Sequence, residues 1–174
     1  MRKELGFSGL EAAVILIAFV VVAAIFGYTM LSTGFFATQR FQEVTYAGVK
    51  QSTSTVITDG FIRGTYSESN GGLQSLSISI SVPETGEAID LSEMVYYYVR
   101  DSGSGGEIPL SAVTPHTGLL SPGASTRIRL DLDAANMEGP MVGGSFSLEI
   151  KPPLGASTLI QRTLPTAFAG GYIS

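Results

Sequence analysis

The feature that most constrains this chain is a long uncharged stretch near its start. Residues 12–39 contain no Asp, Glu, Lys or Arg, and the run 10–26 is apolar apart from Glu11. A helix that is apolar on every side is surrounded by lipid or by other helices rather than by water. Residues 12–36 are long enough to cross a bilayer, which requires about 20 apolar residues.

The helical pattern extends beyond the uncharged stretch. Apolar residues from Phe41 to Val56 follow the spacing of an amphipathic stripe, and the first proline of the chain is Pro83. We therefore predict a helix over residues 7–59 that ends at Gly60, because a residue without a Cβ readily takes the left-handed conformation that ends helices. At about 1.5 Å per residue this helix is longer than a bilayer is thick.

The remainder, residues 61–174, has the pattern of β-strands. Apolar and polar residues alternate in 76–82, 128–132 and 146–150, while 94–99 and 158–163 are further strand candidates. Glycine-rich and proline-rich turns separate these segments, which predicts six to eight short strands. The predicted fold class is α+β, with a long N-terminal helix followed by an antiparallel immunoglobulin-like β-sandwich.

Composition excludes several classes of function. The net charge is −5, and the part after Gly60 has eleven carboxylates against six basic side chains. Nucleic-acid binding requires clustered Lys and Arg, which this chain lacks. Without cysteine there is no disulfide, thiolate metal site or thiol nucleophile.

Candidate catalytic and ligand-binding residues are few. His116 is the single histidine and lies in a predicted loop, and the glycines of residues 103–106 lack the lysine of a phosphate-binding loop. Asp131 and Asp133, with Glu138 nearby, have oxygen ligands suited to Ca²⁺, but strand alternation favours solvated charges on one exposed face. We predict no enzyme activity, no cofactor and no metal site.

The N-terminus has the order of a leader that is cut before the apolar segment. Arg2 and Lys3 precede Gly6 and Phe7, and the apolar run follows them. An ordinary secretory signal has its cleavage site after the apolar segment and so loses it. Cleavage between Gly6 and Phe7 would retain that segment, giving a 1–6 leader, a 7–60 helix and a 61–174 sandwich. The alternative is an uncleaved membrane anchor with its positive residues inside the cell.

Glu11 is a lone carboxylate at the head of the uncharged stretch. Burying it is unfavourable unless it is paired. After cleavage, the new amine of Phe7 on an adjacent subunit would be able to neutralise Glu11. Residues 8–11 also fit a capping box, in which Glu11 accepts hydrogen bonds from the helix N-terminus. The two roles are compatible.

Residues 6–13, followed by the Val, Ile and Ala run, resemble a class III signal peptide of the type IV pilin-like family, and more narrowly the archaellins, or archaeal flagellins. Residues 34–39, 120–123 and 146–156 are also similar to archaellin segments. The resemblance implies that a prepilin peptidase cuts after Gly6. The sequence differs from family leaders in having Glu4 and Leu5 before the glycine, where basic residues are usual, and neither Asn70 nor Asn136 begins a glycosylation sequon.

The resemblance also implies a function. The chain would begin as a precursor in the cytoplasmic membrane and polymerise into the archaellum, an extracellular filament turned by a membrane motor for swimming motility. Its partners would be further copies or other archaellins, the prepilin peptidase, and the membrane assembly and motor machinery. Two alternatives remain: an adhesive type IV pilin-like subunit and a membrane-tethered extracellular binding module.

Small and apolar residues of the N-terminal helix would form the filament core. Small residues allow close helix approach, although they also suit packing within lipid. The predicted core residues are Ala12, Ala13, Val14, Leu16, Ile17, Phe19, Val20, Ala23, Ala24, Phe26 and Gly27.

Overall fold

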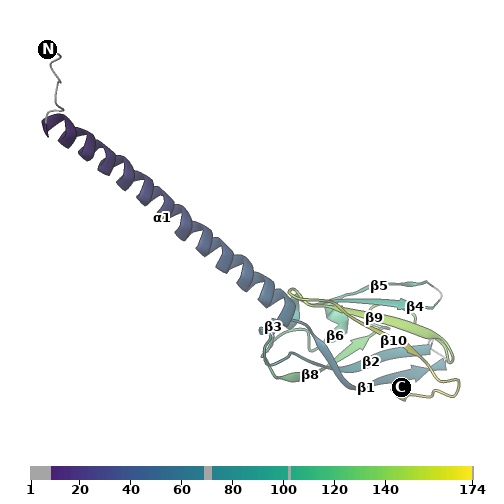
Figure 1. The fold of residues 1–174 in the computed structure, drawn as a ribbon. Helices are drawn as coiled ribbons and strands as arrows, with labels where there is room; N and C mark the ends of the chain where they lie inside the picture. The colour runs from purple at the N-terminus through teal and green to yellow at the C-terminus, as the bar shows by residue number, and fades with distance from the viewer. Residues whose placement is uncertain (1–8, 69–71, 102, 174) are drawn as a thin grey trace, which may run out of the picture. The chain divides into compact units, whose positions relative to one another are not determined.

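The computed structural model describes residues 9–68, 72–101 and 103–173 of the chain. The chain divides into two compact units, Met1–Ala47 and Gly48–Ser174, and each is described by itself. Figure 1 shows the helical first part in purple and blue, and the strands that follow it in colours from blue through teal and green to yellow.

The first element, α1, is an α-helix over Gly9–Thr53. The predicted helix end near Asp59 is wrong, because α1 ends six residues earlier and β1 begins at Ile57. Residues 55–58 are all β-branched, and such side chains favour extended backbone over helix. Val56, which the helical stripe had included, is fully buried in the core of the sandwich.

Gly60 lies within β1 rather than at a helix end. Its φ is +78°, and the pairing of β1 with β2 shifts register between Asp59 and Arg63. Such a shift with a positive-φ glycine is typical of a β-bulge, which bends a strand and re-aims its side chains. The left-handed conformation of Gly60 was therefore predicted correctly, but the glycine lies at a β-bulge and not at a helix end.

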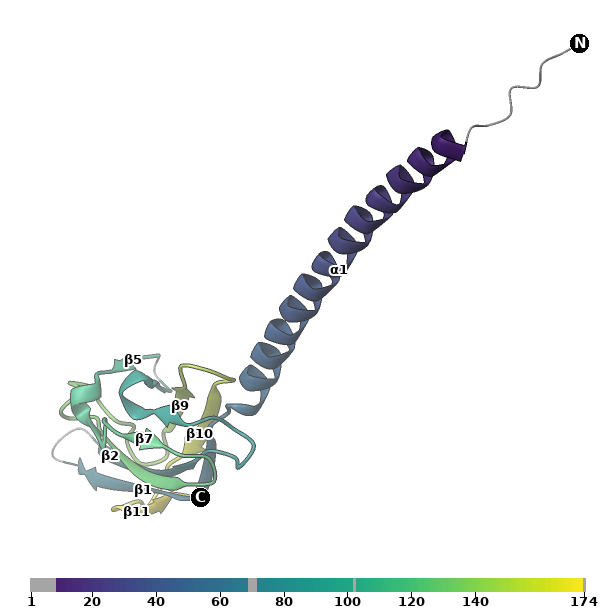
Figure 2. The same ribbon diagram turned by 90° about the vertical axis from the view of Figure 1, so that its left-hand side faces the viewer.

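The strands form two main antiparallel sheets. The five-stranded sheet has the order β11-β1-β2-β8-β6, the four-stranded sheet has the order β10-β9-β4-β5, and β3 pairs with β7. Figures 1 and 2 show the two main sheets as separate layers. The bounds are β1 Ile57–Ser67, β2 Gly72–Ser81, β3 Ile89–Asp90, β4 Val95–Arg100, β5 Gly105–Ile108, β6 Val113–Thr114, β7 Leu119–Leu120, β8 Ser125–Asp131, β9 Ser145–Lys151, β10 Thr158–Thr163 and β11 Gly171–Ile173.

The fold class predicted from the sequence is confirmed, and the five candidate strands correspond to β2, β8, β9, β4 and β10. The described residues contain eleven strands rather than six to eight. Several of the additional strands, such as β3, β6 and β7, have only two residues each. Two residues are too few for alternation to be recognised in a sequence.

The core of the sandwich lies between the inner faces of the two main sheets. Leu76, Ile78 and Ile80 of β2 are buried there, as are Phe146 and the alternate residues that follow it in β9. Burial of an apolar side chain contributes about 1.5 to 3 kcal/mol relative to its exposure. The alternation seen in the sequence is thus the alternation between core and solvent.

Two tyrosines of β4 point into this core. Tyr98 stacks on Phe146 with ring centroids 6.1 Å apart, and the Tyr96 hydroxyl donates to the Met94 sulfur at 3.6 Å. Burial raises the pKa of Tyr96 to about 12. Burial also raises the pKa of Tyr98, an effect that the charge of Arg100 partly offsets.

The last residues of α1 and the first residues after it are fixed to the sandwich by side-chain and backbone contacts. The hydroxyl of Thr158 donates to the Val56 carbonyl, and Lys50 pairs with Glu87. At Gly155, whose φ is +98°, a Cβ would lie 1.7 Å from the carbonyl oxygen of Ser54. Only glycine fits there, because both the conformation and the space exclude a side chain.

Candidate functional site

The candidate functional site is the surface of α1. None of its residues is buried within the chain, and Phe19 and Leu16 are 77% and 67% exposed. Its most apolar 18 residues have a mean hydropathy of 2.7, and α1 is long and apolar enough to cross a membrane. All the predicted filament-core residues, from Ala12 to Gly27, lie on this exposed helix.

An exposed surface of this kind drives association. At roughly 25 cal/mol per Å² of apolar area, burying a helix of this length releases on the order of tens of kcal/mol. Lost freedom of motion and ordering of side chains offset much of that release. The apolar helix nevertheless requires an apolar environment, which lipid and other copies of the helix can both supply.

The threonine hydroxyls of α1 donate to the backbone of the same helix. The hydroxyl of Thr33 donates to the carbonyl of Thr29 at 2.7 Å, and that of Thr38 donates to the carbonyl of Gly34 at 2.9 Å. Such bonds satisfy a hydroxyl in surroundings without water. Threonine is therefore compatible with a helix that other helices or lipid enclose.

The glycines of α1 leave open space on the helix surface. A Cβ added at Gly27, Gly34 or Gly48 would meet no atom within 4 Å. Glycine inside a helix is about 1 kcal/mol less favourable than alanine, so packing within this chain does not explain these residues. They do suit the close approach of a second helix.

The second half of α1 contains charged residues. Arg40 pairs with Glu43 at 2.9 Å, and its guanidinium lies 5.6 Å from the centroid of the Phe36 ring. A cation above an aromatic face is attracted by the ring quadrupole. Arg40 is thus the first charged residue after the uncharged stretch, and its guanidinium contacts two side chains of the same helix.

Glu11 lies in the first turn of α1 and is exposed. A carboxylate near a helix N-terminus is favoured by the helix dipole, which is consistent with the predicted capping role. Gly6 and Phe7, the predicted cleavage positions, lie outside the described residues, as does Ser8 of the predicted capping box. The leader and its cleavage therefore stay predictions.

His116 and Asp131, which the sequence offered as candidate catalytic or metal-binding residues, make local contacts. His116 is exposed, with its Nδ1 2.9 Å from the carbonyl of Val113, and Asp131 accepts a bond from the backbone of Ala134. Within residues 9–68, 72–101 and 103–173, no group of three His, Cys, Asp or Glu side chains is placed to hold a metal ion.

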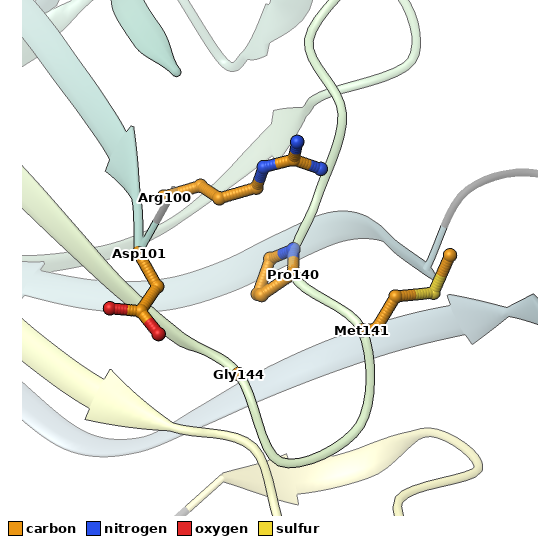
Figure 3. A pocket seen from close by; sticks show the side chains of 5 residues that line it. All are labelled: Arg100, Asp101, Pro140, Met141 and Gly144. Carbon is orange, nitrogen blue, oxygen red and sulfur yellow. The ribbon is translucent and has the colours of Figure 1, made fainter. Parts of the chain in front are cut away.

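A hollow of about 340 Å³ lies beside the end of β4, where Arg100 and Asp101 meet the loop that contains Pro140 and Met141. Figure 3 shows the Asp101 carboxylate pointing away from the Arg100 guanidinium. Arg100 instead pairs with Glu138 at 3.0 Å. These residues fix one end of the sandwich, since the backbone of Asp101 donates to that of Ser145.

Sequence reasoning missed the contact of Gly155 with the Ser54 carbonyl. Its only signal was the similarity of residues 146–156 to archaellin segments, which carries no physical reason by itself. The structure supplies the reason, because this glycine lies against the backbone that leads out of α1 into β1.

Comparison with known proteins gives consistent matches. The model of the family described as archaeal-type flagellin matches residues 6–162. The chain is 32% identical to a probable flagellin 2 of Archaeoglobus fulgidus, over 96% of this chain and 93% of that protein. It is 33% identical to a probable flagellin 1 of the same organism, over 95% and 92%.

Solved structures agree with these matches. The subunit of the archaeal flagellum of Methanospirillum hungatei is similar with a TM-score of 0.83 and 47% identity, over 97% of this chain and 100% of that one. A flagellin of Methanocaldococcus jannaschii shares the fold, with a TM-score of 0.58 at 18% identity over 69% and 96%. This chain therefore belongs to the archaeal-type flagellin family, a family of structural filament subunits.

Proposed function

We propose that this flagellin is made as a membrane-inserted precursor, loses its leader, and polymerises through α1 into an extracellular filament that serves swimming motility. One observation carries the proposal: the apolar helix has no buried residue within its own chain. Such a surface requires lipid before assembly and neighbouring copies of α1 after it. A head-to-tail contact that repeats without closing produces a helical polymer.

The leader would be removed between Gly6 and Phe7 by a prepilin peptidase. Cleavage there leaves the entire apolar stretch on the mature subunit. Membrane assembly and motor proteins would then be the remaining partners, and copies of this chain or other archaellins would be its neighbours in the filament. The finding that supports this order is the position of the apolar stretch immediately after the leader.

Glu11 would guide assembly by its charge. Cleavage creates a new amine on Phe7, and the amine of one subunit would pair with the Glu11 carboxylate of another during insertion into the filament. Such a pair would lower the free energy of placing either charge in an apolar core. It would also fix the axial position of one helix relative to the next.

The alternatives predict different consequences. A tethered binding module would need an anchor of about 20 apolar residues, whereas α1 has 45 residues. An adhesive filament would use the same helix but would attach cells to surfaces. Deleting the gene separates the two filament types, since loss of swimming with normal attachment supports the motility role and the reverse result contradicts it.

Mass spectrometry of sheared surface material tests the proposal most directly. We expect the N-terminal peptide to begin at Phe7, in filaments recovered from the cell exterior. A chain that retains Met1 and stays in the membrane fraction would contradict the proposal and would favour the tethered module.

Two substitutions separate the possible roles of Glu11. Glu11→Gln keeps a side chain able to cap the helix but removes its charge, whereas Glu11→Ala removes both functions. We expect both variants to lower filament yield about tenfold, equivalent to about 1.4 kcal/mol per subunit. Quantitative electron microscopy measures the yield. If Glu11→Gln gives a normal yield and Glu11→Ala does not, the charge role is ruled out and only the capping role remains.

A further inference from the structure

The two outer faces of the sandwich differ in the charges that lie near their centres. The exposed residues Arg63, Arg127 and Arg129 lie on the outer face of the five-stranded sheet. They are half of the six basic side chains that follow Gly60. The outer face of the four-stranded sheet instead presents Glu107 and Glu149.

Strand register places two of the arginines in one line across the first face. Arg63 of β1 pairs with Tyr172 of β11 on one side and with Ser77 of β2 on the other, and Ser77 pairs with Arg129 of β8. We call these four residues the arginine row. Its order is Arg129, Ser77, Arg63, Tyr172, and Tyr172 is 70% exposed.

A second line crosses the opposite face. Tyr97 of β4 pairs with Glu107 of β5 and with Glu149 of β9, and Glu149 pairs with Leu159 of β10. We call these four residues the glutamate row. Its order is Glu107, Tyr97, Glu149, Leu159, and Tyr97 and Leu159 are 44% and 64% exposed.

The two rows match position by position. In each row the two charges are separated by one strand, which places them about 10 Å apart. Between the charges, the small Ser77 would face the large Tyr97. Beyond them, the exposed Tyr172 would face the exposed Leu159. Reversing one row and shifting it by one strand also pairs the charges, but it places Leu159 against Thr114, the β6 residue that pairs with Arg129. The direction that brings the exposed Leu159 onto the exposed Tyr172 buries more apolar surface, so we use that direction.

The charges of both rows are available to a partner. In the described residues the salt bridges within the chain join other side chains, namely Arg40 with Glu43, Lys50 with Glu87 and Arg100 with Glu138. Because the rows lie on opposite faces of one sandwich, they cannot meet within one subunit. A charge pair across an interface sets register and excludes wrong partners more than it adds affinity.

Other charges on the two faces lie outside the rows. Asp59 and Arg127 flank Ser79 in the next line of the first face, and Asp131 lies in the line on the other side. Lys151 follows Glu149 by two residues along β9. Only the arginine row and the glutamate row therefore have two like charges each.

We infer that the arginine row of one subunit docks on the glutamate row of a second copy in the filament, an inference that rests on the proposed function. The contact is heterologous, because a twofold contact would place arginine against arginine. Arg63 would meet Glu149, and Arg129 would meet Glu107. Repetition of this contact gives the sandwiches a direction and extends without closing.

Cross-linking tests the inference in assembled filaments, because the natural chain has no cysteine. The double variant Arg63→Cys with Glu149→Cys is expressed in the native cell, and its filaments are treated with a bismaleimide whose span of about 10 Å matches the spacing of packed sheets. We expect a ladder of multimers on a denaturing gel. Each single variant should give at most dimers.

A matched control uses Glu84→Cys with Glu149→Cys, which places the first cysteine in an exposed turn away from the arginine row. We expect no ladder from it. Monomers alone from the Arg63→Cys and Glu149→Cys filaments would overturn the inference. If the unaltered chain itself forms no filaments, the proposed function fails instead, so the two failures are distinguishable.

Charge exchange supplies a second test. Arg63→Glu with Arg129→Glu should lower filament yield at least tenfold, as should Glu107→Arg with Glu149→Arg, and combining all four should restore at least half of it. Arg127→Glu with Arg162→Glu changes the net charge by the same amount as Arg63→Glu with Arg129→Glu, and it should leave the yield unchanged. Normal yield from both row variants, or failure of the fourfold variant to recover, would contradict the inference.

Discussion

The helix and the sandwich of this flagellin differ in where their apolar surface is buried. Among its described residues, the sandwich buries 26 hydrophobic side chains between Val56 and Ile173 within a single chain. None of the 45 residues of α1 is buried in the same chain. One part can thus complete its core by folding, whereas the other completes its core only in lipid or among other copies.

Separate segments of the chain therefore encode folding and assembly. Alternation along strands produces a face for the core and a face for solvent. A helix that is apolar all round has no solvent face, so its final surroundings must come from outside the chain.

The largest effect should follow from a charge placed in the middle of α1. Val20→Asp should lower filament yield at least a hundredfold, since a carboxylate in apolar surroundings costs about 3 kcal/mol per subunit. Electron microscopy measures the yield, and immunoblots of membranes measure the precursor. Val20→Leu, which keeps the surface apolar, is the control. Normal filaments from the Asp variant would show that Val20 faces water.

Removal of a core ring should damage the sandwich. Phe146→Ala should lower the free energy of unfolding by about 3 to 5 kcal/mol, because it leaves a cavity beside Tyr98. Calorimetry of purified protein should show the loss in the sandwich transition. Tyr97→Ala, at an outward and partly exposed position of β4, should cost much less. Equal losses for the two variants would mean that the outer face is as well packed as the core.

A methyl group added beside the segment between α1 and β1 should destabilise the sandwich. Gly155→Ala should destabilise the sandwich by about 2 to 5 kcal/mol, through backbone strain at positive φ and a clash with the Ser54 carbonyl. Gly103→Ala is the matched control, because Gly103 also has a positive φ but open space around it. Thermal melting compares them. Equal shifts would indicate that conformation alone, rather than close approach, requires Gly155.

The smallest effect concerns alkaline pH. Because burial raises the pKa of Tyr96 from 10.0 to about 12, the protonated ring stabilises the folded sandwich below pH 10, and that contribution is lost as the pH rises toward 12. The melting temperature should fall in this window. Tyr96→Phe with Tyr98→Phe should reduce the decline. A decline of the same size in that variant would assign it to other groups.

The elements found from sequence were those with a long, regular pattern. The uncharged run after Glu11 predicted α1, and alternation predicted β2, β8 and β9, because burial imposes a period on residue type. The end of α1 was misplaced because neither Gly nor Pro occurs between Thr53 and Gly60. The β-branched residues 55–58 were the available signal, and the helical spacing of Val56 concealed it.

The candidate site was predicted to a different extent in its different parts. Sequence identified the apolar surface of α1, because hydrophobicity is a property of each residue. It did not identify the arginine and glutamate rows, whose members come from strands far apart in the chain. Arg63 and Arg129 become neighbours in one line only through their shared partner Ser77.

The apolar helix, the alternating strands and the acidic balance of the outer part could therefore be predicted from the order of residues alone. The end of α1, the requirement for glycine at position 155 and the charges that share a face became visible only in the folded chain. Helix hydrophobicity and strand alternation depend on residues that are close in sequence. Strand register and close backbone approach instead join residues that are far apart in sequence. Thr158 and Val56, which are 102 positions apart, are an example.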